Sequence, residues 1–370
     1  MLNSACSVFM KLAVFPMFVV VGAAAGCSSG KAGPAVLQGV FVATGSMTVP
    51  RENHKATLLP NGKVLIVGGF ASSGECLASA QLYDPAAGTF VETGSMTTPR
   101  VGHTVTLLPT GKILIAGGSY VRIGGLTPLI TPLASAELYD PSSGTFAETV
   151  SMTMARGGHS ATLLPSGKLL IAGGNFGIVD AEIYDPVAGT SAATGNMSVA
   201  RQMHSAALLP NGKVLIAAGS NSDSYSLASA ELYDPSSGTF AATGDMTADR
   251  WGQAATLLPS GKVLITGGNS TTDILASAEL YDPLAGTFAA TGNMTERTAF
   301  HTATLLQDGR VLITGTIADL FDPATGTFSA ADSMIGSRSW HTATLLRSGM
   351  VLVAGGTSHQ GILASAELYQ

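Results

Sequence analysis

The residues best suited to chemistry in this chain are its histidines, which recur at regular intervals and mostly follow an arginine by three positions. Imidazoles gathered in a ring could bind a metal or transfer protons. One copy of the pattern, however, has Gln253 in this place, and glutamine forms hydrogen bonds but is a poor metal ligand. We therefore expect the histidines to join neighbouring structural units, and we assign no metal. They are His54, His103, His159, His204, His301 and His341.

Carboxylates recur in the same way, within the sequence Glu-Leu-Tyr-Asp-Pro. Glu137 and Asp140 are one such pair. Two carboxylates can act as acid and base. Here the pair returns in copy after copy, and an aspartate directly before a proline is typical of a turn. We expect these residues, and the arginines that precede the histidines, to be structural, and we assign no catalytic residue.

These residues are positioned by one unit that the chain repeats seven times. Consecutive copies are about 40 to 56 residues apart. A repeat of this size, rich in short apolar runs and turn residues, predicts a propeller or a solenoid. The copies are marked by Met47, Met96, Met152, Met197, Met246, Met294 and Met334.

Each copy contains four segments that read as strands. In the second copy they are residues 103–108, 112–116, 134–139 and 145–149, and turn residues such as Pro109 to Gly111 separate them. No segment has a helical period over ten or more residues. Four antiparallel strands in a repeat of this length make one propeller blade.

The two ends of the chain predict how the ring closes. Residues 39–46 match the fourth strand of a copy, as a comparison with residues 88–95 shows, and residues 364–370 form a third strand with none after it. The N-terminal strand should complete the last blade and remove the exposed edges of an open array. The predicted fold class is all-β: a closed, seven-bladed β-propeller of four-stranded antiparallel blades.

The repeat resembles the kelch repeat. The likeness lies in the glycine doublet Gly117-Gly118, the tyrosine of the third strand, the aromatic that opens the fourth strand and the Arg-x-x-His motif, and it covers residues 39–370. The chain departs from the usual pattern with phenylalanine, such as Phe146, where tryptophan is common. The fold alone does not fix a function.

The N-terminal residues carry the signs of export. Lys11 precedes an apolar run over residues 12–21, which predicts a signal peptide over residues 1–26. Residues 24–27 resemble the lipobox of bacterial lipoproteins, which implies cleavage before Cys27 and lipidation of that residue. A lipidated tether over residues 27–35 and a propeller over residues 36–370 would follow. The alternative is an ordinary secretory signal with an incidental cysteine.

By the same analogy Ser28, which follows the cysteine, favours the outer membrane, so we expect an exported, periplasmic or cell-surface lipoprotein held by its lipid alone.

Charged residues make up 11% of the chain, and its net charge is −6. No cluster of lysine or arginine is present, so nucleic acid is not an expected partner. Cys76 is the only other cysteine of the mature chain, which excludes an internal disulfide. We expect a monomer without a cofactor.

Two enzymatic alternatives follow from the resemblance. Galactose-oxidase-like copper enzymes carry a seven-bladed kelch propeller, but their chemistry needs two tyrosines, two histidines and a cysteine joined to one tyrosine. Cys76 is the only candidate cysteine here, and the accessory domains of those enzymes are missing. A sugar epimerase or mutarotase would need an arginine and a glutamate outside the repeat pattern, and Arg122 with Glu52 is the only pair available.

A binding site is expected where the repeat breaks down. In a blade, the loop from strand two to strand three and the crossover to the next blade lie on one face, and both are irregular here. Exposed aromatic residues on such a face predict binding of a protein or glycan. The alternative is that these aromatic residues fill gaps between blades. The candidate ligand-binding residues are Trp251, Phe300, Trp340, Asn53, Glu52, Tyr120, Arg122 and Tyr225.

The sequence therefore favours a lipid-anchored binding protein outside the cytoplasm. The alternative is a carbohydrate-active enzyme that uses the same face.

Overall fold

The computed structural model describes residues 39–122, 129–175 and 177–370, which belong to one compact unit. The predicted signal peptide (residues 1–26) and tether (residues 27–35), including Cys27, lie outside the described residues. No helix in the described ranges is long and apolar enough to cross a membrane.

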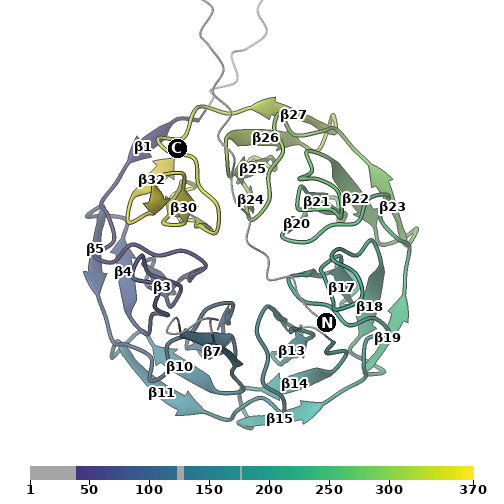
Figure 1. Ribbon diagram of the computed structural model, residues 1–370, viewed down its shortest axis with the longest axis horizontal. Helices are drawn as coiled ribbons and strands as arrows, with labels where there is room; N and C mark the ends of the chain where they lie inside the picture. The colour runs from purple at the N-terminus through teal and green to yellow at the C-terminus, as the bar shows by residue number, and fades with distance from the viewer. Residues whose placement is uncertain (1–38, 123–128, 176) are drawn as a thin grey trace, which may run out of the picture. The chain divides into compact units, whose positions relative to one another are not determined.

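Seven four-stranded antiparallel sheets are arranged around a ring, as predicted (Figure 1). The strands closest to the centre are β2 (Lys55–Leu58), β6 (Thr104–Leu107), β12 (Ser160–Leu163), β16 (Ser205–Leu208), β20 (Ala254–Leu257), β24 (Thr302–Leu305) and β28 (Thr342–Leu345). Nearly all their residues are half-buried, so solvent reaches the centre of the ring.

The second strand of each blade is buried on both faces. These strands are β3 (Val64–Val67), β7 (Ile113–Ala116), β13 (Leu169–Ala172), β17 (Val214–Ala217), β21 (Val263–Thr266), β25 (Val311–Thr314) and β29 (Val351–Ala354). Alternate residues of β3 enter two different core clusters: Val64 packs with residues of blade seven, and Leu65 with residues of blade two. The aliphatic runs of the sequence thus fill the spaces between blades.

The third strands carry the repeated tyrosine. They are β4 (Ala80–Asp84), β10 (Ala136–Asp140), β14 (Ala181–Asp185), β18 (Ala230–Asp234), β22 (Ala278–Asp282), β26 (Ala318–Asp322) and β32 (Ala366–Tyr369). The Tyr139 ring packs 4.8 Å from that of Phe146, and its hydroxyl is hydrogen-bonded to Thr93 of the preceding blade. This packing accounts structurally for the repeated Tyr and Phe.

The outer strands form the rim in Figure 1. They are β5 (Thr89–Glu92), β11 (Thr145–Thr149), β15 (Thr190–Ala193), β19 (Thr239–Ala242), β23 (Thr287–Ala290), β27 (Thr327–Ala330) and β1 (Phe41–Ala43). The strand β1 pairs with β32, with Phe41 opposite Tyr369. The N-terminal strand therefore completes the last blade, which confirms the predicted closure.

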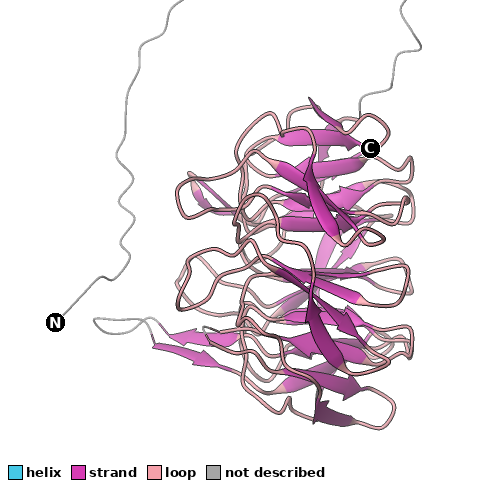
Figure 2. Ribbon diagram, turned by 90° about the vertical axis from the view of Figure 1, so that its right-hand side faces the viewer, coloured by secondary structure: helices cyan, strands magenta, loops and turns pink. Residues whose placement is uncertain are grey.

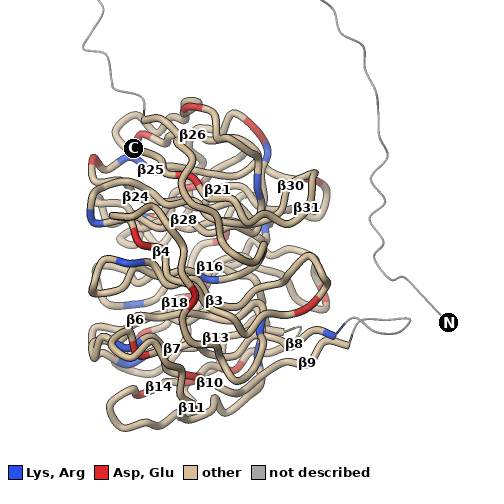
Figure 3. Tube along the Cα trace, turned by 90° about the vertical axis from the view of Figure 1, so that its left-hand side faces the viewer, with Lys and Arg blue, Asp and Glu red and all other residues tan. Residues whose placement is uncertain are grey.

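Two short hairpins extend the loops between second and third strands. One is β8 (Ser119–Arg122) with β9 (Leu129–Pro132), and the other is β30 (Thr357–Ser358) with β31 (Gly361–Ile362). The sequence predicts irregular loops between second and third strands, but the ends of segment 119–132 in blade two pair, because residues such as Tyr120, Val121 and Ile130 favour extended backbone. The β8–β9 hairpin projects from the ring (Figure 2), on the same side as β30–β31 (Figure 3).

Candidate functional site

The irregular segments of the chain meet on one face of the propeller, as expected. In several blades the crossover pairs with the start of a loop of the same blade: Trp251 pairs with Asn269, and Ser339 with Thr357. We call this side the crossover face. The tight turns between first and second strands and between third and fourth strands lie at the opposite end of each blade.

A ring of residues with left-handed backbone lies on the crossover face, one residue before each histidine position. Its φ angles lie between 50° and 68°. Main-chain hydrogen bonds link several members across blades: the Asn53 amide donates to the Trp340 carbonyl (2.8 Å), and the Trp340 amide donates to Phe300 (2.9 Å). We call these residues the left-handed ring. Its members are Asn53, Gly102, Gly158, Met203, Gly252, Phe300 and Trp340.

Three aromatic side chains form a continuous cluster on this ring. The Phe300 and Trp340 rings are stacked, with centroids 3.8 Å apart, and the Trp251 ring meets Phe300 edge-on at 5.2 Å. All three are half-buried. A Cβ atom at Gly252 would lie 2.6 Å from Cε1 of Phe300, so the phenyl ring covers that glycine. The aromatic cluster therefore spans blades five, six and seven and keeps part of its surface exposed.

Asn53 and Glu52 lie beside the cluster in blade one. The Asn53 amide joins that blade to Trp340, as described above. The Glu52 main chain pairs with Phe70, and burial raises the pKa of its carboxyl group, although a hydrogen bond from Thr357 opposes the shift. Glu52 is thus held at the edge of the aromatic cluster.

The other three predicted binding residues lie elsewhere on this face. Tyr120 and Arg122 belong to the β8 strand of the projecting hairpin in blade two. Tyr225 lies in a loop of blade four and is 82% exposed. In the described part of the chain, none of these residues packs its ring or guanidinium on the aromatic cluster. The structure therefore does not bring all eight candidates into one site.

The repeat histidines directly follow the left-handed ring in the chain; five of them are buried, and His204 is half-buried. Nε2 of His54 is hydrogen-bonded to the Thr342 hydroxyl of the preceding blade (3.0 Å), and His204 contacts Ser160 in the same way (2.8 Å). Gln253 donates to Ser205 (3.0 Å), which explains why glutamine can replace histidine. Burial lowers the pKa of His204 to about 3. Apart from His103, the repeat histidines are each hydrogen-bonded to the neighbouring blade, as the repeat predicts.

The arginines and glutamates of the repeat form buried ion pairs. Arg100 and Glu137 are 2.8 Å apart, and the same pair recurs in blades three, four, five and seven. Blade one has Gln81 in place of the glutamate, and blade six has Thr298 in place of the arginine. Across the described residues, no three His, Cys, Asp or Glu side chains gather as metal ligands.

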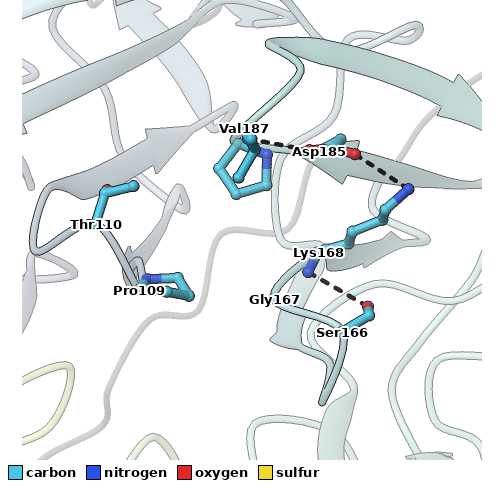
Figure 4. Close-up of a pocket in the computed structure, with 8 residues that line it drawn as sticks. Pro109, Thr110, Ser166, Gly167, Lys168, Asp185 and Val187 are labelled. Carbon is cyan, nitrogen blue, oxygen red and sulfur yellow. Dashed lines mark hydrogen bonds and ion pairs between the residues drawn. The ribbon is translucent and has the colours of Figure 1, made fainter.

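Two surface hollows of the propeller have no residue of the aromatic cluster in their lining. One, of about 250 Å³, lies between the hairpin turns of blades two and three and contains Pro109, Lys168 and Asp185 (Figure 4). Its Lys168–Asp185 ion pair (3.0 Å) recurs in other blades, for example as Lys63–Asp84, so it reflects the repeat. A second hollow, of about 310 Å³, lies in blade seven beside His359.

Two features of this region are not visible in the sequence as motifs. The first is the left-handed ring, which only the glycines Gly102, Gly158 and Gly252 could have indicated. The second is the environment of Lys55, which holds the place that Thr or Ser usually takes at the start of an innermost strand.

The comparisons with known proteins identify the fold. No family model and no curated protein sequence matches the chain. Among solved structures, the chain is similar to a fungal alcohol oxidase of the AA5 family determined in complex with copper. The sequences are 18% identical, the match covers 90% of this chain and 76% of the other, and the TM-score is 0.68. At this identity, the likeness shows a shared propeller fold and not a shared activity.

Proposed function

We propose that this protein binds a glycan or a protein through the aromatic cluster on its crossover face. The observation that carries the proposal is that Phe300 and Trp340 occupy left-handed positions where three other blades have glycine. A left-handed backbone is unfavourable for bulky residues and costs of the order of 1–3 kcal/mol per residue. The fold accommodates glycine at this position, so it does not by itself require the aromatic side chains.

The form of the cluster favours a sugar ring or the flat side chain of a peptide as ligand. Two stacked rings and a third at their edge offer rigid, partly exposed apolar surface, with the polar Asn53 beside it. Aromatic residues held by a scaffold lose little conformational entropy on binding. Their faces can stack on the C–H groups of a sugar while neighbouring polar groups orient it.

A binding screen tests this proposal. Purified residues 28–370 would be applied to glycan and peptide arrays, and each hit would be measured by calorimetry against the Trp251→Ala variant. We expect a glycan or peptide that binds the parent protein and loses about tenfold or more in affinity with the variant. Hits whose affinity is the same with both proteins would contradict the proposed site.

We further propose that the protein is exported as a monomer and anchored by lipid on Cys27, with the outer membrane as its destination. The supporting features are the apolar run, the small residues before Cys27 and Ser28 after it. The Cys27→Ala variant should lose the lipid, which mass spectrometry would detect, and should leave the membrane fraction. An unchanged mass and unchanged fractionation would contradict the anchor.

An enzymatic role on the same face is the alternative outcome of the screen. Turnover of a bound sugar would favour a carbohydrate-active enzyme of the galactose-oxidase-like or the epimerase and mutarotase-like kind. Copper chemistry is not part of the proposal, because the described residues do not fit a copper site. Five of the six repeat histidines are hydrogen-bonded to the neighbouring blade, and the Cys76 sulfur lies against the main chain of Ser119 and Val121.

A further inference from the structure

Lys55 is an exception among the residues that begin the innermost strands. The equivalent residues in the other blades are small and uncharged, and several are hydrogen-bonded to the histidine of the next blade. They are Thr104, Ser160, Ser205, Ala254, Thr302 and Thr342. The bond between Thr342 and His54 shows that the side chain at this position is directed toward the next blade. Lys55 therefore introduces a positive charge beside His103.

His103 is the only one of the six repeat histidines without a hydrogen bond on Nε2 in the described structure. It is 1% exposed, and neither of its ring nitrogens has a partner. A buried polar group without a partner costs about 1–3 kcal/mol. The cause is local, since lysine has replaced the hydroxyl that the histidine would contact.

The ammonium group of Lys55 is equally without a partner. It forms no ion pair within 4.0 Å and no hydrogen bond with any described residue, whereas Lys63 in the same blade pairs with Asp84 at 2.9 Å. Arg100, whose charge also acts on His103, is already paired with Glu137. Burial lowers the pKa of Lys55, and the Lys55 charge adds to burial in holding the pKa of His103 well below its usual value.

We infer that Lys55 and His103 form a binding site for a carboxylate or a similar oxyanion at the centre of the ring, between blades one and two. The ammonium group can donate three hydrogen bonds, and a neutral imidazole can donate one. A carboxylate has two oxygens to accept them and would neutralise the charge. Lys55 is half-buried on a half-buried strand, so an anion could approach the site from the lysine side, whereas His103 is buried.

The carboxylate could come from a free anion or from a larger ligand. Lys55 follows Asn53 of the left-handed ring by two residues, or roughly 6–7 Å along a strand. A ligand held at the aromatic cluster could therefore extend an acidic group toward it. The anion site itself does not depend on the proposed function, and the two sources predict different results.

The experiment compares the parent protein with Lys55→Thr, which restores the hydroxyl found at this position in other blades. Sodium acetate would be titrated at constant ionic strength, with the melting temperature as readout. For a free anion we expect acetate to raise the melting temperature of the parent protein and not that of Lys55→Thr. The Lys63→Met variant, which removes a lysine at the far end of the blade, should respond as the parent does.

The second arm uses a uronic-acid oligosaccharide and its neutral counterpart. If the ligand supplies the carboxylate, the acidic sugar should bind the parent about tenfold more tightly than it binds Lys55→Thr, and the neutral sugar should bind both equally. Lys55 dependence in either arm supports the site. Responses to acetate and to the acidic sugar that are the same in parent and Lys55→Thr would overturn it, even if the aromatic cluster binds neutral sugars.

Discussion

Phe300 and Trp340 come from adjacent blades, yet their rings are stacked at 3.8 Å with planes only 16° apart. The main chain sets this arrangement, because the Trp340 amide donates to the Phe300 carbonyl and both residues have left-handed φ angles. The stacking is thus a property of two neighbouring blades acting together. A ligand at this position would contact both blades at once.

The first prediction separates binding from stability at this stack. In Trp340→Gly, the loss of aromatic packing should be partly offset by relief of the left-handed strain, so we expect a melting temperature close to that of the parent. Affinity for a ligand found in the screen should fall by the equivalent of roughly 1–3 kcal/mol. Calorimetry and thermal unfolding measure the two effects.

Met203 provides the matched control. It belongs to the left-handed ring but lies in blade four, outside the three blades that form the aromatic cluster. Met203→Gly should leave affinity unchanged. A strongly reduced melting temperature with intact affinity in Trp340→Gly would instead show that the aromatics fill gaps between blades.

The second prediction concerns the buried ion pair of Arg100 and Glu137, which are 2.8 Å apart. Glu137→Ala should lower the free energy of unfolding by about 3–5 kcal/mol, because it leaves a buried guanidinium without its counter-charge. Glu137→Gln should cost less, since blade one has Gln81 at the equivalent position and still buries Arg51. Urea unfolding measures both, and equal losses would show that charge pairing is unimportant there.

The third prediction is a loss of stability in mild acid. Burial lowers the pKa of His159, His204 and His341 to about 3 and that of His301 to about 4. The unfolded chain takes up these protons near pH 6.5, so the stability they contribute is present above that pH and is lost as the pH falls toward 3–4. Each histidine contributes a slope of up to about 1.4 kcal/mol per pH unit.

His301→Gln should reduce this slope, since Gln253 shows that an amide fits the same position. Denaturant unfolding between about pH 4.5 and 6.5 is the measurement, because free carboxyl groups titrate mostly below this range. A free energy of unfolding that stays constant over the range would show that the histidines are not buried as neutral groups.

The fold was predictable because each blade repeats the same local signals. These signals can be recognised from the sequence alone: aliphatic runs such as residues 112–116, turn residues and the match between the two chain ends. The left-handed ring was not, because the sign of φ at Phe300 or Trp340 depends on hydrogen bonds to the next blade. The lack of a hydrogen bond at His103 could not be predicted for a similar reason. The residue that would supply the hydroxyl belongs to another blade, and there it is Lys55.

The site was therefore predictable only in part. Trp251, Phe300 and Trp340 could be placed together because they hold nearly equivalent positions in consecutive copies. Tyr120 and Tyr225 belong to insertions without a repeat position, so no register could be assigned to them from the repeat.

The last prediction concerns closure of the ring. The strand β1 is held by pairing of Phe41 with Tyr369, whose rings are 5.0 Å apart, and by a hydrogen bond from the Val40 amide to the Gln370 carbonyl (3.0 Å). Deleting residues 39–46 should expose the edge of β32 and uncover part of the core between blades six and seven, which includes Phe41. We expect aggregation or a large decrease in melting temperature.

Attaching the same residues after Gln370 through a short flexible linker should restore the strand and the stability, because pairing depends on position in the sheet and not on order in the chain. Size-exclusion chromatography and thermal unfolding measure both variants. A deletion variant that remains monomeric and as stable as the parent would mean that this strand does not hold the ring closed.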